Sequence, residues 1–226
     1  MPVKNGENFI KETLLNLLEN TTNEDEIIII DDGSTDDTKK IVNNFSNMSK
    51  APVIMLKGQN LLPSGARNKG LEIARGEYIS FIDHDDLWPK NRLDDHINLL
   101  KNSTNAGVIQ GRVKYFSALP SKLDIFDYLD QDKTTFFFQL GSFTFKSDIL
   151  KKIGSFNPEL KFGEDVDLYL RLLDDEIKII KDEKVALLYR IHDTNMTKNY
   201  AENDNRVLLK ILSSSIKRKK IKEQLG

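Results

Sequence analysis

Several features that are missing from this sequence restrict what the protein can do. None of the 226 residues is cysteine, which excludes disulfides, thiolate catalysis and cysteine-bound zinc, and fits the reducing cytoplasm, where we expect the protein. The formal net charge of −2 gives no basic field, so we expect no nucleic acid partner. No apolar run is long enough to cross a bilayer. The glycine patterns of P-loop and classical dinucleotide-binding proteins are also absent.

Strands and helices alternate along the first 88 residues. Four consecutive isoleucines, Ile27–Ile30, end at a turn sequence and are typical of a buried parallel strand. The next strands are expected at Val53–Leu56 and Tyr78–Ile82. Helices are expected between and before them, over Asn8–Asn20, Asp36–Phe45 and Ser64–Ala74. This alternation predicts an α/β domain with a mainly parallel sheet.

The second half of the chain has a less regular pattern. Its expected helices are Pro89–Asn102, Ser147–Ile153 and Glu164–Leu173. Its expected strands are Val108–Phe116, Phe136–Phe145 and Val185–Ile191, and Lys122–Lys133 is expected to be a loop or a helix.

The end of the sequence, Asn203–Gln224, has apolar residues on one side of a predicted helix and then the basic run Lys217–Lys220. A basic amphipathic helix of this kind can lie on an anionic membrane, which would place the protein at the inner face of the cell membrane. The alternative is a helix that packs on the domain and leaves its basic end in solvent. Of these two interpretations, the sequence favours the helix that packs on the domain.

Acidic residues follow two of the predicted strands. Asp31 and Asp32 come after the isoleucine run, and Asp83–Asp86 come after Tyr78–Ile82. Ligands of α/β sheets bind at the carboxyl ends of strands, so both clusters are candidates for a site. Asp83 and Asp85 share one face of an extended segment, and paired carboxylates suit Mg²⁺ or Mn²⁺ with a diphosphate. The alternative is an acidic surface turn, which we disfavour because the segment lies between a buried strand and an aromatic residue.

Three further positions have a structural as well as a functional interpretation. Glu164 and Asp165 begin a predicted helix after Gly163, where carboxylates either cap the helix or supply a general base. Arg67 begins another helix and either binds a diphosphate or is an exposed residue of an amphipathic helix. His192 is either a metal ligand or a surface histidine.

Five segments, taken in order, resemble the family-2 inverting glycosyltransferases of the GT-A fold. They are PVKN (Pro2–Asn5), IIIIDDGSTDDT (Ile27–Thr38), GARNKG (Gly65–Gly70), ARGEYISFIDHDDLW (Ala74–Trp88) and GEDVDLYLRL (Gly163–Leu172). The resemblance covers the chain from Pro2 to about Thr197. It implies a Rossmann-like α/β/α sandwich with a mostly parallel central sheet. The family has an apolar strand directly before the first segment, where this chain has only Met1, so we expect this first strand to be absent or truncated.

The resemblance also implies a division of the chain and a set of nucleotide contacts. It implies a GT-A domain over residues 1–200, with a nucleotide-binding half to about residue 88 and an acceptor half from about residue 89, followed by the basic helix of residues 201–226. Pro2 and the residues after it, including Asn5, would flank the nucleotide base. Asp31 and Asp32 would contact the base or its ribose, and Arg67 would lie near the base or the diphosphate.

The remaining implied roles concern the metal, the catalytic base and the acceptor. Asp83 would bind the ribose or the metal, Asp85 in the DxD motif would bind the metal directly, and His192 would lie near the metal and the diphosphate. The implied general base is Asp165, supported by Glu164, and Trp88 would border the acceptor site.

The implied reaction transfers a sugar from a nucleotide-diphosphate donor, in most cases a UDP-sugar, to a hydroxyl of a glycan or glycolipid. It proceeds with inversion, uses Mn²⁺ or Mg²⁺, and belongs to the synthesis of bacterial polysaccharides or glycoconjugates. The main alternative is a catalytically impaired member of the same fold that only binds a nucleotide-sugar. A nucleotidyltransferase is disfavoured because its Gly-rich, basic N-terminal loop is missing.

Overall fold

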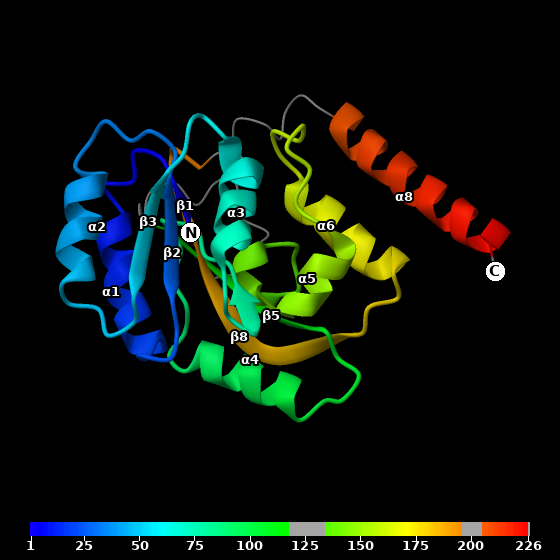
Figure 1. Ribbon diagram of the computed structural model, residues 1–226, viewed down its shortest axis with the longest axis horizontal. Helices are drawn as coiled ribbons and strands as arrows, with labels where there is room; N and C mark the ends of the chain where they lie inside the picture. The colour runs from blue at the N-terminus through cyan, green and yellow to red at the C-terminus, as the bar shows by residue number, and fades with distance from the viewer. Residues whose placement is uncertain (118–133, 196–204, 226) are drawn as a thin grey trace.

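The first half of the chain forms a three-layer α/β/α arrangement. The computed structural model describes residues 1–117, 134–195 and 205–225. Its first sheet is parallel, with strand order β1 (Pro2–Val3), β2 (Ile27–Asp31) and β3 (Val53–Lys57). Helices α1 (Ile10–Asn20) and α2 (Thr38–Ser46) cover one face of this sheet, and α3 (Leu62–Ile73) covers the other (Figure 1). The prediction of an α/β fold is confirmed.

The first strand is short, as the sequence led us to expect. Strand β1 has two residues and pairs in parallel with β2, with Pro2 opposite Ile30 and Val3 opposite Asp31. The amino group of Met1 donates a hydrogen bond of 2.9 Å to the carbonyl oxygen of Ile28, which extends this pairing by one residue. Strand β1 thus lies within the PVKN segment and forms one edge of the parallel sheet.

The second sheet is mixed. Its strand order is β4 (Tyr78–Ser80), β7 (Phe143–Lys146), β5 (Val108–Ser117) and β6 (Thr134–Thr135), and β8 (Ile179–Ile191) lies beside β5. Strands β5 and β8 are parallel, whereas β7 is antiparallel to β4 and β5. The parallel sheet expected from the sequence is thus found for Ile27–Ile30 and Val53–Leu56. The third strand predicted for it, Tyr78–Ile82, lies instead in the mixed sheet as β4, antiparallel to β7.

One predicted strand is wrong. The apolar segment Phe136–Phe145 was expected to be continuous, but Leu140–Ser142 forms the short 3-10 helix η2 and only the residues from Phe143 onward are in β7. The turn is closed by the N–H of Ser142, which donates to the carbonyl oxygen of Gln139. A Cβ at Gly141 would lie 2.6 Å from Leu187 Cδ1, so the turn depends on glycine at this position. Only the part from Leu140 onward is buried, whereas Phe137 is 49% exposed, so an apolar run of this kind does not by itself indicate a strand.

The remaining helices agree with the sequence to within a few residues. They are α4 (Arg92–Lys101), α5 (Ser147–Ile153), α6 (Glu164–Asp174) and α8 (Asn205–Leu225), and α8 runs alongside α6 (Figure 1). Strand β8 begins six residues before the predicted strand Val185–Ile191. The segment Lys122–Lys133, predicted to be a loop or a helix, lies outside the described residues. Within the described residues, no helix is both long and apolar enough to cross a membrane.

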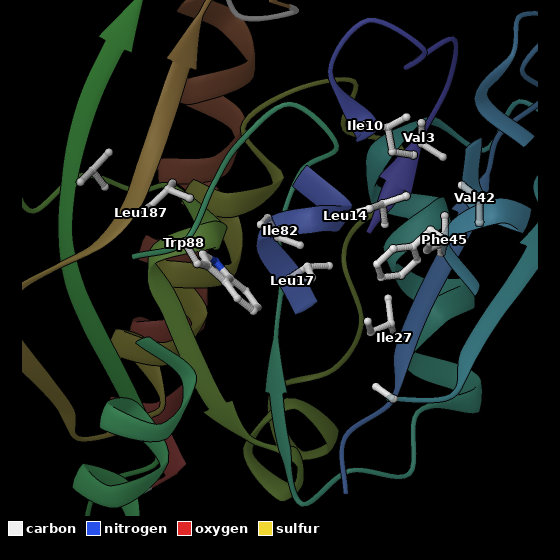
Figure 2. Close-up of a cluster of buried hydrophobic side chains, with 13 residues drawn as sticks. Val3, Ile10, Leu14, Leu17, Ile27, Val42, Phe45, Ile82, Trp88 and Leu187 are labelled. Atoms are coloured by element: carbon white, nitrogen blue, oxygen red, sulfur yellow. The ribbon is translucent and has the colours of Figure 1, made fainter. Parts of the chain in front are cut away.

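A cluster of buried apolar side chains connects the two sheets. Figure 2 shows side chains from α1, β2 and α2 gathered with Ile82 and Trp88, which follow β4. Leu187 of β8 and Val113 of β5 belong to the same cluster. Because the two sheets share this core, the loop between β4 and α4, which carries the acidic residues, is anchored on both sides.

We expect Leu14→Ala to lower the free energy of unfolding by about 2–5 kcal/mol, because Leu14 is fully buried in this cluster and the truncation leaves a cavity. The control is Leu15→Ala, the same substitution at the next residue of α1, where the side chain is exposed and the effect should stay below about 0.5 kcal/mol. Urea unfolding measures both. Equal losses would show that α1 does not pack as described.

Candidate active site

The acidic loop after β4 directs its carboxylates to different partners. Asp83 forms an ion pair with Arg67, and Asp85 forms a hydrogen bond with His192. Asp86 is buried and accepts a hydrogen bond of 2.9 Å from the backbone N–H of Arg190. Burial and the neighbouring carboxylates raise the pKa of Asp86 well above its ordinary value. Asp83 and Asp85 therefore pair with ionisable side chains of other elements, whereas Asp86 ties the loop to β8.

Arg67 joins the acidic loop to the start of α6. One terminal nitrogen lies 2.8 Å from Asp83 Oδ1 and the other 2.5 Å from Glu164 Oε1. The side chain is only 6% exposed. Burial alone would lower the pKa of Arg67, but the two carboxylates raise it above its ordinary value, so the guanidinium remains charged. Arg67 is therefore a buried bridge between two carboxylates and not an exposed residue of an amphipathic helix.

Asp85 and His192 form a second pair on the same loop. His192 Nε2 lies 2.9 Å from Asp85 Oδ2, and the imidazole stacks on the ring of Phe9 with a centroid distance of 4.3 Å. The backbone N–H of Thr194 donates to His192 Nδ1 at 3.3 Å, so Nε2 is the nitrogen directed at the carboxylate. Burial acts to raise the pKa of Asp85, but the hydrogen bond from His192 together with the charges of His84 and His192 outweighs it and lowers this pKa. The alternative of a surface histidine is wrong, because His192 is buried.

The donor atoms of this pair suit a divalent cation that is shared with a substrate. Within residues 1–117, 134–195 and 205–225, no group of three or more acidic or histidine side chains converges in the manner of a complete metal cage. Asp85 Oδ2 and His192 Nε2 do converge and offer one oxygen and one nitrogen. Mg²⁺ and Mn²⁺ are commonly held by one or two protein ligands while phosphate oxygens and water complete the shell. Asp83 is occupied by Arg67 and is less available for this role.

Asp165 is a carboxyl group at the start of α6 whose surroundings raise its pKa. Helix α6 starts after Gly163, whose φ of 76° is left-handed, and Glu164 and Asp165 lie in its first turn. Asp165 Oδ1 accepts a hydrogen bond of 2.8 Å from the N–H of Val166, so this carboxylate does stabilise the start of the helix. Asp165 lies at an apolar pocket that is lined, among others, by Phe138, Phe143 and Tyr169. Burial raises the pKa of Asp165 to about 7, and the negative charge of Glu164 adds to the increase. Near neutral pH this carboxyl group can therefore accept and release a proton.

Asp31 and Asp32 hold loops around the first sheet. Asp31 Oδ1 accepts a hydrogen bond of 2.9 Å from the N–H of Ser34. Asp32 accepts hydrogen bonds from the N–H groups of Leu61 and Leu62 at 2.8 and 3.2 Å. Both carboxylates are buried, and Asp31 Oδ2 forms an ion pair of 3.4 Å with Lys39 Nζ. The pair builds the carboxyl edge of β2, and its contact with a nucleotide stays a prediction.

Pro2 and Asn5 lie at the same edge. Pro2 is in β1, and Asn5 follows it in a left-handed conformation with a φ of 52°. The N–H of Asn5 donates to Ser34 Oγ, and Asn5 Oδ1 accepts from the N–H of Thr35 at 2.9 Å. The PVKN segment and the DDGS segment are therefore fastened together, as a joint nucleotide pocket would require.

Trp88 occupies a different position from the one that the sequence suggested. It is 5% exposed and lies in the cluster of Figure 2, where its indole N–H donates to the carbonyl oxygen of Gly141 at 3.0 Å. The guanidinium of Arg92 covers its ring at 4.5 Å. Trp88 packs as a core residue because both its ring and its polar nitrogen are satisfied internally, and we therefore assign it no contact with an acceptor.

The sequence did not single out Arg190, a residue of β8 that holds the acidic loop through contacts with Asp85 and Asp86. Its Nε donates to the carbonyl oxygen of Asp85 at 2.7 Å, and its Nη2 forms an ion pair of 2.8 Å with Glu12. Arg190 and His192 are alternate residues near the end of β8, so both side chains reach the same side of the strand. The spacing of the segment RIH was the available signal, but its meaning depended on the contact with Asp85.

A family model described as glycosyl transferase family 2 matches residues 1–154. An uncharacterised glycosyltransferase of Rickettsia typhi is 28% identical over 87% of this chain, which spans 64% of the length of that protein. A glucosyltransferase of Escherichia coli named for transfer from UDP-Glc to GlcNAc-diphosphoundecaprenol is 28% identical over 86% of this chain and 77% of its own length.

Solved structures agree on the fold. TarS of S. aureus, crystallised with UDP-GlcNAc, is 21% identical and superposes with a TM-score of 0.76 over 96% of this chain and 64% of the TarS chain. This similarity shows a shared GT-A fold.

Proposed function

Because the chain belongs to glycosyl transferase family 2, we propose that it transfers a sugar from a nucleotide-diphosphate donor to an acceptor hydroxyl with inversion at the anomeric carbon. The observation that carries this proposal is the Arg67 bridge. It brings the acidic loop at Asp83 and the start of α6 at Glu164, which are far apart in sequence, to opposite ends of one guanidinium. A donor site and a proton acceptor thereby lie next to each other, as a single displacement requires.

We assign binding of the diphosphate to the end of the acidic loop. Asp85 and His192 are the residues that would hold Mn²⁺ or Mg²⁺, and such a cation, when bound, neutralises charge on the departing nucleotide diphosphate. Phe9, Thr194 and Asn195 fix the imidazole of His192 so that its Nε2 stays directed at the site. Arg67 holds Asp83 in place through charge and hydrogen bonding, and we assign Pro2 and Asn5, at the end of β1, to contact with the base.

Asp165 is the proposed general base. The acceptor oxygen forms a bond to the anomeric carbon while the bond from that carbon to the diphosphate oxygen breaks, and the hydroxyl proton passes to Asp165. Its pKa of about 7 suits this task, because a large part of the carboxyl groups is ionised at neutral pH and the carboxylate is basic enough to take a proton. Glu164 supports the base by raising its pKa and by anchoring the start of α6 on Arg67.

A UDP-sugar and a glycan or glycolipid acceptor are the proposed substrates. The E. coli relative is named for a UDP-Glc donor and a diphosphoundecaprenol-linked acceptor, and the TarS structure contains UDP-GlcNAc. Both names concern other proteins and support the chemical class only. These names support our proposal of a role in bacterial polysaccharide or glycoconjugate synthesis, and the cytoplasm is the location we propose from the lack of cysteine.

The test is a thermal-shift series with UDP-sugars, with Mn²⁺ or with EDTA, followed by an assay for released UDP. At a donor concentration of 100 Kd the native state should gain about 2.7 kcal/mol, and EDTA should remove most of this gain. Asp85→Asn should weaken the metal-dependent gain, whereas Asp148→Asn, which replaces an exposed carboxylate of α5, should not change it.

Two outcomes would contradict parts of this proposal. No shift with any nucleotide-sugar would exclude the transferase assignment for this chain. A shift without release of UDP, in the presence of several glycan acceptors, would support the catalytically impaired binding protein instead.

A further inference from the structure

Helix α8 presents a stripe of apolar side chains to solvent. Leu208, Leu209, Leu212 and Ile216 are between 42% and 63% exposed. Leu208, Leu212 and Ile216 are spaced four residues apart and therefore lie above one another on one side of the helix. A helix whose only purpose was to cover the domain would direct these side chains inward.

The stripe cannot turn inward, because the neighbouring face of α8 is already fastened to α6. Ile211 is buried, and the Ser215 hydroxyl donates to Asp174 Oδ1 at 2.7 Å. Arg218 Nε donates to the other oxygen of Asp174 at 2.7 Å, and Lys222 Nζ donates to its backbone carbonyl oxygen. These bonds set the rotation of α8 about its own axis and leave the apolar stripe facing away from α6.

The charge on α8 is opposite to that of the rest of the molecule. Seven lysine and arginine residues lie between Asn205 and Leu225 against one acidic residue, Glu223, so the helix carries a net charge of +6. The whole chain carries −2, which leaves −8 for the remainder. Two copies of this helix packed against each other would bring +6 next to +6. The combination of exposed leucines and clustered lysines is suited instead to a surface that is apolar beneath a layer of negative charge.

We propose that α8 docks on an anionic membrane surface, with the leucine stripe at the acyl boundary and Lys217 and Lys220 among the lipid phosphates. A Cβ at Gly163 would lie 3.2 Å from Ile211 Cδ1, so α8 touches the residue before Glu164. Docking therefore holds the start of α6, and with it Asp165, near the lipid. For the function proposed above, this position favours an acceptor that is itself anchored in the membrane, and this last step rests on that proposal.

The test is flotation of the full chain with vesicles of phosphatidylcholine alone and of phosphatidylcholine with phosphatidylglycerol. The protein should float with the anionic vesicles only, and added salt should release it. The double substitution Lys217→Gln and Lys220→Gln should weaken this binding roughly tenfold or more. Leu208→Ser with Leu212→Ser should weaken it to a similar extent, because the apolar contribution is lost.

The matched control removes the same charge elsewhere. Lys40→Gln with Lys50→Gln changes two exposed lysines of the first half of the chain and should leave vesicle binding unaltered. Equal binding of neutral and anionic vesicles, or no binding, would overturn the proposal. So would a dimer in sedimentation that the leucine substitutions dissociate, since a second copy would then occupy the stripe. Vesicle binding needs no donor, and the donor-dependent thermal shift needs no vesicle, so the two proposals fail separately.

Discussion

Asp165→Asn is expected to lower the rate of sugar transfer about 10²–10⁴-fold, the usual contribution of a positioned general base. Asn has nearly the same shape as Asp but cannot take the proton of the acceptor hydroxyl. The affinity for the donor should change little, because the proposed donor contacts lie on the acidic loop and on His192. Initial rates of UDP release with acceptor, together with donor titrations, separate the two effects.

The pH dependence gives a second readout of the same residue. Burial raises the pKa of Asp165 to about 7, so the base is mostly protonated at pH 5 and mostly ionised at pH 8. The transfer rate at low substrate concentration should therefore rise with pH through about 7. The rise contributed by this group should be absent in Asp165→Asn, whose residual rate has no base to titrate.

As pH rises, the free energy of unfolding of the parent protein should fall while its transfer rate increases. As pH rises from about 4 to about 7, the carboxyl group of Asp165 ionises in the unfolded chain before it does in the folded one, so the parent loses stability over this window. Asn carries no charge, and the variant should match the parent near pH 4 and exceed it at pH 8. Asp148→Asn serves as the control for both measurements. Full transfer activity in Asp165→Asn would show that the base lies elsewhere.

The positions of the acidic residues could be predicted from the sequence, but their pairing could not. The alternation of strands and helices fixed which carboxylates follow a strand, and this placed Asp83, Asp85 and Asp165 correctly at element ends. Arg67 joins two of these loops because α3 lies against both, and no local pattern encodes a contact across 97 residues. His192 had two interpretations for the same reason, since only its contact with Asp85 excludes a surface position.

Two expectations from the sequence, for Trp88 and for the segment Phe136–Phe145, differ from the structure. The acceptor role of Trp88 was implied by the family resemblance, and the strand Phe136–Phe145 was predicted from local apolar character, which does not specify a strand. Trp88 follows an acidic loop, where an exposed aromatic would serve a substrate, yet its indole N–H is held by the carbonyl oxygen of Gly141. That carbonyl belongs to the turn which interrupts the predicted strand, so one unforeseen turn accounts for both differences.

Arg67→Met is expected to lower the free energy of unfolding by roughly 3 kcal/mol and to reduce transfer. Loss of one partner of a buried ion pair costs about 3–5 kcal/mol, and we take the lower end because Asp83 is partly exposed. The positive charge of Arg67 also lowers the pKa of Asp165, so its removal should shift the pH profile of transfer toward alkaline pH. Urea unfolding and rate measurements across pH test both expectations.

Two further variants distinguish the buried bridge from an ordinary loss of charge. Arg75→Met removes an exposed arginine whose Nε lies 3.6 Å from Glu26, and it should cost less than about 1 kcal/mol. Combining Arg67→Met with Glu164→Gln removes the carboxylate that the first substitution leaves buried without a partner, so it should recover part of the lost stability. It should not restore transfer, because the acidic loop and α6 would still lack the charged group that connects them. An Arg67→Met protein as stable as the parent would show that the bridge does not form.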